Sequence, residues 1–239
     1  MRSNAVVSLT YNQPRKKNKM TLSSSSRCCA AILLAVSMSC VANAQSKLPA
    51  DLDRQSRARL PYLKKSNLDE KVQKSLQPFV TKDDALGGPL AFAAYNSAVA
   101  QALLDLHNGA VLGGTLDPRT RELAILVACR ETNYNLEWNA HEILGLKAGL
   151  DANLIDTVRY KRPLAGFNEK DATVIRFGRQ IFHDKKVDSA TFAKVVEFWD
   201  KRGAMDMVAV MSTYAVSGYF AIAVDEHSPE GKAELPVGK

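Results

Sequence analysis

The sequence predicts an all-α fold, a compact helical bundle built around a central antiparallel hairpin of two helices. Three observations lead to this prediction. Apolar residues recur at helical spacing over most of residues 89–224. Start and stop signals for helices separate the periodic segments, and no convincing strand run interrupts them.

The segment before the predicted domain is polar and punctuated by prolines. Residues 45–88 are therefore interpreted as an N-terminal extension, with one short helix from about Asn67 to Gln77 that Pro78 terminates. The first helix of the domain is expected over AFAAYNSAVAQALLDLH, residues 91–107, where Asn108-Gly109 ends the periodicity.

The two helices of the hairpin have the clearest boundaries. An Asp-Pro pair at 117–118 supplies a cap and a proline in the first helical position, and this helix runs to about Glu131. Asn133 or Asn135 caps the second helix, which ends at Gly149, a residue suited to a left-handed closing position. A connection of about five residues packs the pair antiparallel.

Four more helices are expected after the hairpin. They cover Asp151 to about Tyr160, Glu169 to Phe182, Ser189 to Lys201 with Arg202-Gly203 closing it, and Met205 to Val224. The last is strongly apolar, so it is either an internal core helix or a surface for oligomer assembly. Residues 225–239 have the composition of a flexible tail.

The formal charge of +7 does not indicate a nucleic-acid partner. Residues 1–44 hold six of the 32 basic residues and none of the 25 acidic ones, so the remaining chain is nearly neutral. Within them an uncharged apolar stretch leads to Ala42-Asn43-Ala44, a cleavage signature. We therefore expect a signal peptide over residues 1–44, with residues 1–19 as an over-long start. The mature protein is expected to be exported, periplasmic or secreted, and not bound to a membrane.

Cleavage would leave Cys129 as the sole cysteine of the mature chain. A single cysteine forms no internal disulfide. Its apolar neighbours favour a small buried side chain.

Three ionisable residues fall on otherwise apolar faces of the hairpin: Glu122, Glu137 and His141. Glu137 precedes His141 by one helical turn, and the hairpin brings Glu122 of the first helix toward them. An imidazole that titrates near neutral pH beside carboxylates favours proton transfer. The alternative interpretation is a solvated Glu-His pair in a first helical turn. His107 and His183 lie near helix C-termini, where the helix dipole explains them.

The segment from Leu116 to Leu150, with RELAIL, EWNAHE and LKAGL, resembles the carboxymuconolactone decarboxylase family, which includes the alkylhydroperoxidase D-like proteins. In the peroxidase branch a Cys-x-x-Cys pair precedes the histidine. Aligned on His141, those positions hold Tyr134 and Glu137, and both thiols are missing. The decarboxylase branch keeps the glutamate and the histidine without the cysteines.

The resemblance to the decarboxylase branch implies a lyase without metal or organic cofactor, acting on a carboxylated lactone or a similar small organic acid. It implies His141 as proton shuttle, Glu122 as its carboxylate partner or a second acid-base group, and Glu137 as an orienting or substrate-contacting group. It also implies a homo-oligomer, a trimer or hexamer. Further candidates for substrate binding are Tyr134, Trp138, and Arg121 or Arg130.

Two alternatives stay open. One is an antioxidant activity of the alkylhydroperoxidase or peroxiredoxin type, which the missing Cys-x-x-Cys pair disfavours. The other is a non-catalytic oligomeric binding domain that keeps the fold.

Overall fold

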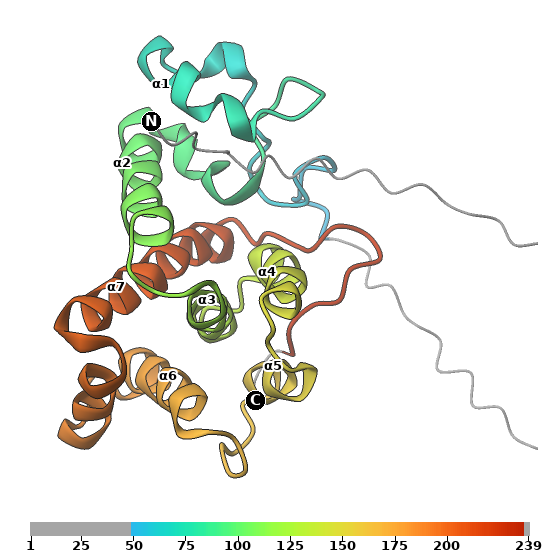
Figure 1. Ribbon diagram of the computed structural model, residues 1–239. Coiled ribbons are helices and arrows are strands. Elements are labelled where there is room, and N and C mark those ends of the chain that lie inside the picture. The colour runs from blue at the N-terminus through green and yellow to red at the C-terminus, as the bar shows by residue number, and fades with distance from the viewer. Residues whose placement is uncertain (1–48, 237–239) are drawn as a thin grey trace, which may run out of the picture. The chain divides into compact units, whose positions relative to one another are not determined.

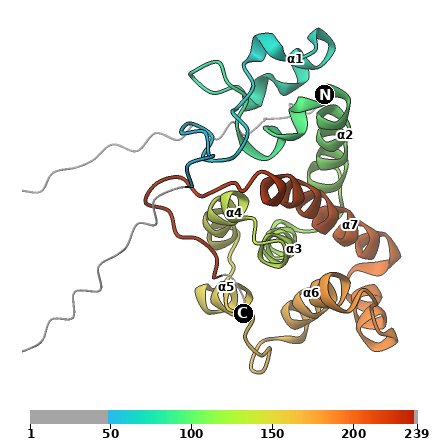
Figure 2. The same cartoon turned by 180° about the vertical axis from the view of Figure 1, so that it is seen from behind.

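The computed structural model describes residues 49–236, and the predicted leader over residues 1–44 lies outside them. This part of the chain forms seven α-helices with short 3-10 and π-helical turns between them (Figures 1 and 2). Extended pairing within it is limited to two isolated bridges, Lys64 with Ala85 and Val80 with Leu86. The all-α prediction is confirmed.

The N-terminal extension packs onto the domain through a small core of its own. Helix α1 (Glu70–Leu76) begins after Asp69, whose carboxylate accepts the N–H of Lys71. Its buried side chains Val72 and Leu76 join a cluster with apolar residues of α2. The extension is thus polar only on its outer side.

Helix α2 (Ser97–His107) starts later than the sequence pattern predicts. The Asn96 side chain accepts the N–H groups of Ala98 and Val99, which sets the start there, and a 3-10 turn precedes it. Its end also differs, because the chain continues from His107 into a π-helical turn, Asn108–Leu112. This turn carries the chain toward α3.

Helix α3 (Pro118–Glu131) lies in the middle of the bundle, with α4, α6 and α7 packed around it (Figure 1). Asp117 caps it through the N–H of Thr120, as predicted. Helix α4 (Asn135–Lys147) follows a short turn, and the Arg119 side chain donates to the carbonyl of Gly149. The start of α3 therefore meets the end of α4, which confirms the antiparallel hairpin.

The remaining helices are α5 (Ala152–Arg159), α6 (Glu169–Arg179), which runs into a π-helical turn, and α7 (Ser189–Ala223). Two helices were expected in place of α7, with the junction at Arg202-Gly203. The break lies slightly earlier, at Asp200, whose φ of 56° and ψ of −174° are not helical. The Asp200 carboxylate accepts the N–H groups of Arg202 and Gly203, so it caps the second half of α7.

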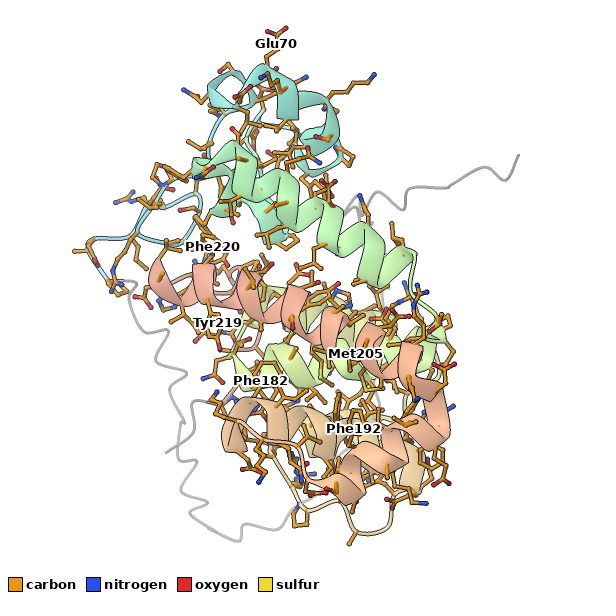
Figure 3. The ribbon with its side chains drawn as sticks, turned by 90° about the vertical axis from the view of Figure 1, so that its left-hand side faces the viewer. Glu70, Phe182, Phe192, Met205, Tyr219 and Phe220 are labelled. Carbon is orange, nitrogen blue, oxygen red and sulfur yellow. The ribbon has the colours of Figure 1, made fainter. Side chains whose placement is uncertain are left out.

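The second half of α7 packs against the core with one face and exposes the other face to solvent. By length and composition α7 would be apolar enough to cross a membrane, but half of its most apolar window is buried inside the domain. Met207 and Met211 are buried there. Met205 and Tyr219 are more than half exposed, and Figure 3 shows α7 from the side that carries them.

The C-terminal segment differs from the flexible tail that its composition predicts. Leu235 is buried in the main core, and its N–H donates to the Asn135 side chain. The His227 N–H donates to the carbonyl of Arg57 in the extension. An apolar side chain and paired backbone groups therefore hold residues 225–236 against the domain, and the prediction of a flexible tail is wrong for them.

Candidate functional site

The structure brings the three predicted acid-base residues together at the centre of the hairpin. His141 Nδ1 lies 2.7 Å from Glu122 Oε2, and His141 Nε2 lies 3.3 Å from Glu137 Oε2. The three side chains are only 9–11% exposed. We call them the Glu-His-Glu relay. Within residues 49–236, no group of three or more His, Cys, Asp and Glu side chains is placed to hold a metal ion.

Close helix packing sets the geometry of this relay. A Cβ at Gly145, one turn after His141, would lie 2.8 Å from Leu150 and 3.4 Å from Leu126, so the missing side chain lets α4 approach α3. A Cβ at Gly218 on α7 would lie 2.6 Å from the Thr132 hydroxyl. Because α7 passes so close to the turn of the hairpin, its upstream residues reach the relay.

Tyr214 of α7 is the residue that covers the imidazole. Its ring meets the His141 ring edge to face, with 4.9 Å between centroids and 86° between planes. Burial raises the pKa of Tyr214 well above its usual value, and the negative charge of Glu137 adds to this. Tyr214 therefore stays a neutral phenol beside the relay. Its place in the site was not predictable from the sequence, because a tyrosine in an apolar helix is most simply interpreted as a packing residue.

Two opposing effects set the charge of His141. Burial disfavours the imidazolium, but the hydrogen bonds and negative charges of Glu122 and Glu137 outweigh it and raise the pKa to about 9. At neutral pH His141 is therefore protonated on both nitrogens, and each N–H faces a carboxylate. With both glutamates ionised, the relay carries one net negative charge.

Tyr214 also lines a small cavity, whose walls do not include the three relay residues. Its volume is about 30 Å³, and its walls include five apolar residues of the extension and α2, among them Phe79 and Leu103. Its polar lining comes from α2 and α7: His107, Thr213, Tyr214 and Ser217. Tyr214 belongs both to this lining and to the contact with His141, so it connects the cavity with the relay.

His107 ends α2, as predicted, and also lines the cavity next to Tyr214. Its ring centroid lies 6.4 Å from that of Tyr214. Burial lowers the pKa of His107, while a hydrogen bond with Asn108 and the charge of Glu137 act in the opposite direction. The imidazole is therefore mostly neutral at pH 7. Sequence reasoning missed this position because the helix dipole already gave the histidine an explanation.

The other predicted binding residues have different surroundings. Tyr134 is buried, and burial together with the charge of Glu137 raises its pKa well above the usual value. The Trp138 ring stacks under Arg159 at 5.1 Å, and its N–H donates to Glu142. The contacts of Trp138 thus connect α4 with α5, and the structure does not bring this residue to the cavity.

Arg130 is not free to receive a substrate carboxylate. Its guanidinium donates to the carbonyl oxygens of Arg159 and Pro236 and to the Asn133 side chain. These bonds connect α3 with α5 and the C-terminal segment. The prediction of Arg130 as a binding residue is therefore not supported, and its role is structural.

The C-terminal segment adds a carboxylate, Glu226, that was not among the predicted site residues. Burial and the negative charge of Glu137 raise the pKa of Glu226 to about 8. The Tyr62 hydroxyl lies 3.5 Å from Glu226 Oε1. Glu226 is therefore mostly protonated at neutral pH, and it was missed because it lies in a polar segment without helical periodicity.

Cys129 is fully buried on α3. Burial raises the pKa of its thiol well above the usual value, and the charges of Glu137 and Glu122 act in the same direction. The side chain thus stays a thiol at neutral pH, which agrees with the interpretation as a small core residue.

The relay lies in a part of the chain that matches a known protein family. Residues 97–177 match the model of the carboxymuconolactone decarboxylase family, and this range contains the whole relay. No curated protein matches the chain.

Two solved structures share the fold. One is described as an uncharacterized peroxidase-related protein from Silicibacter sp. TM1040; it is 16% identical, with a TM-score of 0.57 over 76% of this chain and 95% of that one. The other is described as an alkylhydroperoxidase AhpD core, an uncharacterized peroxidase-related protein from Ralstonia eutropha JMP134; it is 14% identical, with a TM-score of 0.54 over 72% and 93%. Residues 97–177 thus resemble the carboxymuconolactone decarboxylase family, and the chain shares its fold with these two structures.

Proposed function

We propose that this protein is a lyase of decarboxylase type that uses acid-base chemistry on a carboxylated lactone or a similar small organic acid. The observation that supports this most is a protonated His141 held between Glu122 and Glu137, in ring contact with Tyr214, which lines a small cavity. The match of residues 97–177 to the model of the carboxymuconolactone decarboxylase family supports the same reaction class.

The chemistry requires one proton at carbon. A carboxylate leaves as carbon dioxide when the electron pair of the breaking C–C bond can move into a conjugated carbonyl group, which gives an enolate. The imidazolium of His141 then donates a proton to the carbon that carried the carboxylate, and water returns a proton to the imidazole. Positioned acid catalysis of this kind contributes roughly 10² to 10⁴ in rate.

We assign different roles to the Glu122 and Glu137 carboxylates because they lie at different distances from the His141 ring nitrogens. The 2.7 Å contact of Glu122 with Nδ1 is a short, charge-assisted hydrogen bond that fixes the ring. Glu137 lies 3.3 Å from Nε2, a longer and weaker contact. We therefore assign the proton on Nε2 as the one that is transferred. Glu137 would either give up its contact with Nε2 when substrate binds or relay the proton between Nε2 and the substrate.

A thiol-dependent peroxidase is the alternative, since both structural neighbours are described as peroxidase-related. That reaction requires a thiolate nucleophile and a resolving thiol. Cys129 is buried with a raised pKa, and the described residues contain no second cysteine. The site thus supports proton transfer better. Export and homo-oligomer formation stay predictions from the sequence.

The test is turnover of a panel of carboxylated lactones and β-keto acids, with products identified by mass. Wild type is expected to give a product lighter by one carbon dioxide, and His141→Gln is expected to lose roughly 100-fold or more in kcat. His183→Gln is the matched control, because His183 is half exposed and contacts Glu131 outside the site. Equal rates for wild type and His141→Gln would contradict the proposal.

The alternatives have their own measurements. Reduction of tert-butyl hydroperoxide with a dithiol donor, abolished in Cys129→Ser, would establish the peroxidase instead. Retention of small carboxylates without turnover on the whole panel would favour a binding domain.

A further inference from the structure

Two polar groups in the lining of the small cavity have no hydrogen-bond partner among the residues that the structure describes. One is the hydroxyl of Tyr214, a side chain that is only 4% exposed and whose contacts are ring contacts with His107 and His141. The other is His107 Nδ1, which is buried. Buried polar groups without a partner are rare, because losing water costs free energy that no bond recovers. Since both residues line the cavity, they point to a ligand inside it.

Two further hydroxyls of the lining can accept a hydrogen bond. Thr213 Oγ1 donates to the carbonyl of Ala209 at 2.8 Å, and Ser217 Oγ donates to the carbonyl of Thr213 at 3.2 Å. The hydrogen of each hydroxyl is thus committed to the helix, while lone pairs on the oxygen remain. The lining therefore offers acceptors from Thr213 and Ser217 together with the free donor of Tyr214.

The size of the cavity restricts the ligand to water. Its volume is about 30 Å³, and one water occupies about 30 Å³ of the liquid. A carboxylate or an organic substrate is larger than this. The opposite wall, which includes Phe79, Leu90 and Leu103, is apolar, so the polar partners of a water come from α2 and α7. A buried water needs about two to four such partners, and four polar residues line the cavity.

The charge of the lining also favours a neutral ligand. Burial lowers the pKa of His107 and raises the pKa of Tyr214 well above its usual value, so the imidazole is mostly neutral at pH 7 and the phenol is neutral. The other lining residues are apolar or carry a hydroxyl. An ion would be buried here without a counter-charge, at a high cost in free energy.

We propose that the cavity is a binding site for an ordered water, which accepts a hydrogen bond from the Tyr214 hydroxyl, donates to a hydroxyl oxygen of Thr213 or Ser217, and forms a hydrogen bond with His107 Nδ1. This water connects α2 with α7. It also helps to hold Tyr214 in place, and the ring of Tyr214 lies 4.9 Å from that of His141. The inference is independent of the proposed function, because the water binds whether or not the relay catalyses a reaction.

The first test uses nuclear Overhauser effects between water and the folded wild-type protein in solution. A cross-peak is expected between water and the methyl group of Thr213. The methyl group of Thr173 on α6 is the matched control, because Thr173 is also buried, bears a hydroxyl that contacts a neighbour one turn earlier, and lies outside the cavity. It should give no cross-peak. Equal signals at the two methyl groups, or none at Thr213, would overturn the water site.

The second test is a crystal structure of the wild type at a resolution that shows ordered waters. A solvent peak is expected in the cavity within about 3.2 Å of Tyr214 Oη. Tyr214→Phe keeps the ring but removes the hydroxyl, so it should lose this peak, whereas Thr173→Val should keep it. A wild-type cavity without solvent density, or the same peak in Tyr214→Phe, would contradict the proposal.

The positioning of Tyr214 has its own measurement. Thr213→Val keeps nearly the same shape but removes one acceptor, so the water should be weakened and the NMR signals of the His141 ring should shift. Thr173→Val should leave these signals unchanged. A folded Thr213→Val with wild-type His141 signals would overturn the claim that the water helps to hold Tyr214 against the imidazole.

Discussion

The raised pKa of His141 makes the stability of this protein depend on pH in a predictable direction. The imidazole has a pKa of about 9 in the folded chain, against its ordinary value of 6.5 in the unfolded chain. Between pH 6.5 and pH 9 the His141 imidazole is protonated in the folded state and mostly neutral in the unfolded state. The stabilisation that the protonated imidazole gives the fold is therefore complete below pH 6.5 and is lost as pH rises through 9. The difference corresponds to about 3 kcal/mol in the free energy of unfolding.

The assay is urea unfolding at pH 6.5 and pH 9.5. Glu226 contributes in the same direction, because its pKa of about 8 means that its stabilising effect is complete below pH 4.5 and is lost as pH rises through 8. The comparison is therefore made in a Glu226→Gln background. His141 is expected to account for about 3 kcal/mol of the stability that this protein loses between the two pH values, and that part of the loss is expected to disappear when His141→Gln is added, while the part due to the buried Cys129 thiol remains. An equal loss of stability with and without His141 would refute the claim that His141 is a charged imidazolium with a hydrogen bond to each of the two glutamates.

Three further outcomes are expected. Asp200→Gly should stabilise the fold by roughly 1–2 kcal/mol in thermal unfolding. Glycine relieves a positive φ that costs about 1–3 kcal/mol, and replacing the capping carboxylate by glycine loses only about a few tenths of a kcal/mol. Asp200→Ala should instead destabilise the fold, and the reverse order of the two variants would contradict this explanation. Gly178→Ala should cost about 1–3 kcal/mol in urea unfolding, since its Cβ would lie 2.4 Å from Val127, whereas Gly109→Ala, with nothing within 4 Å, serves as control. Cys129 should react with a thiol reagent at neutral pH only on unfolding; rapid labelling of the folded protein would show that its thiol is accessible.

The hairpin was predictable because its signals are local. Asp117 and Pro118 start α3, and Gly149, with a φ of 90°, follows α4. The three relay residues could also be found, because a charged side chain on an apolar helix face stands out from its neighbours. Their spacing along two adjacent helices fixed which faces would meet.

The remainder of the site depends on contacts between distant segments. Tyr214 and His107 reach the relay from α7 and α2, and each has an adequate local explanation as a packing aromatic or a helix-end histidine. The structural role of Arg130 on α3 depends on where α5 and the C-terminal segment place their carbonyl groups. Composition does not encode these positions.

The C-terminal segment shows the same limit. Its polar composition predicts a flexible end, but one apolar residue, Leu235, packs into the core once the Asn135 side chain accepts its N–H. Glu226 becomes buried as a consequence of this path. Burial of a carboxylate by a segment without periodicity leaves no pattern in the sequence.

The pH dependence of kcat/KM for decarboxylation tests the central claim most directly. If the imidazolium of His141 is the proton donor, the rate should be level from about pH 6.5 to pH 8 and should fall about tenfold per pH unit above pH 9, where the donor loses its proton. A rate that rises up to pH 9 would show that neutral His141 is the active form, and it would contradict the assignment of His141 as the acid.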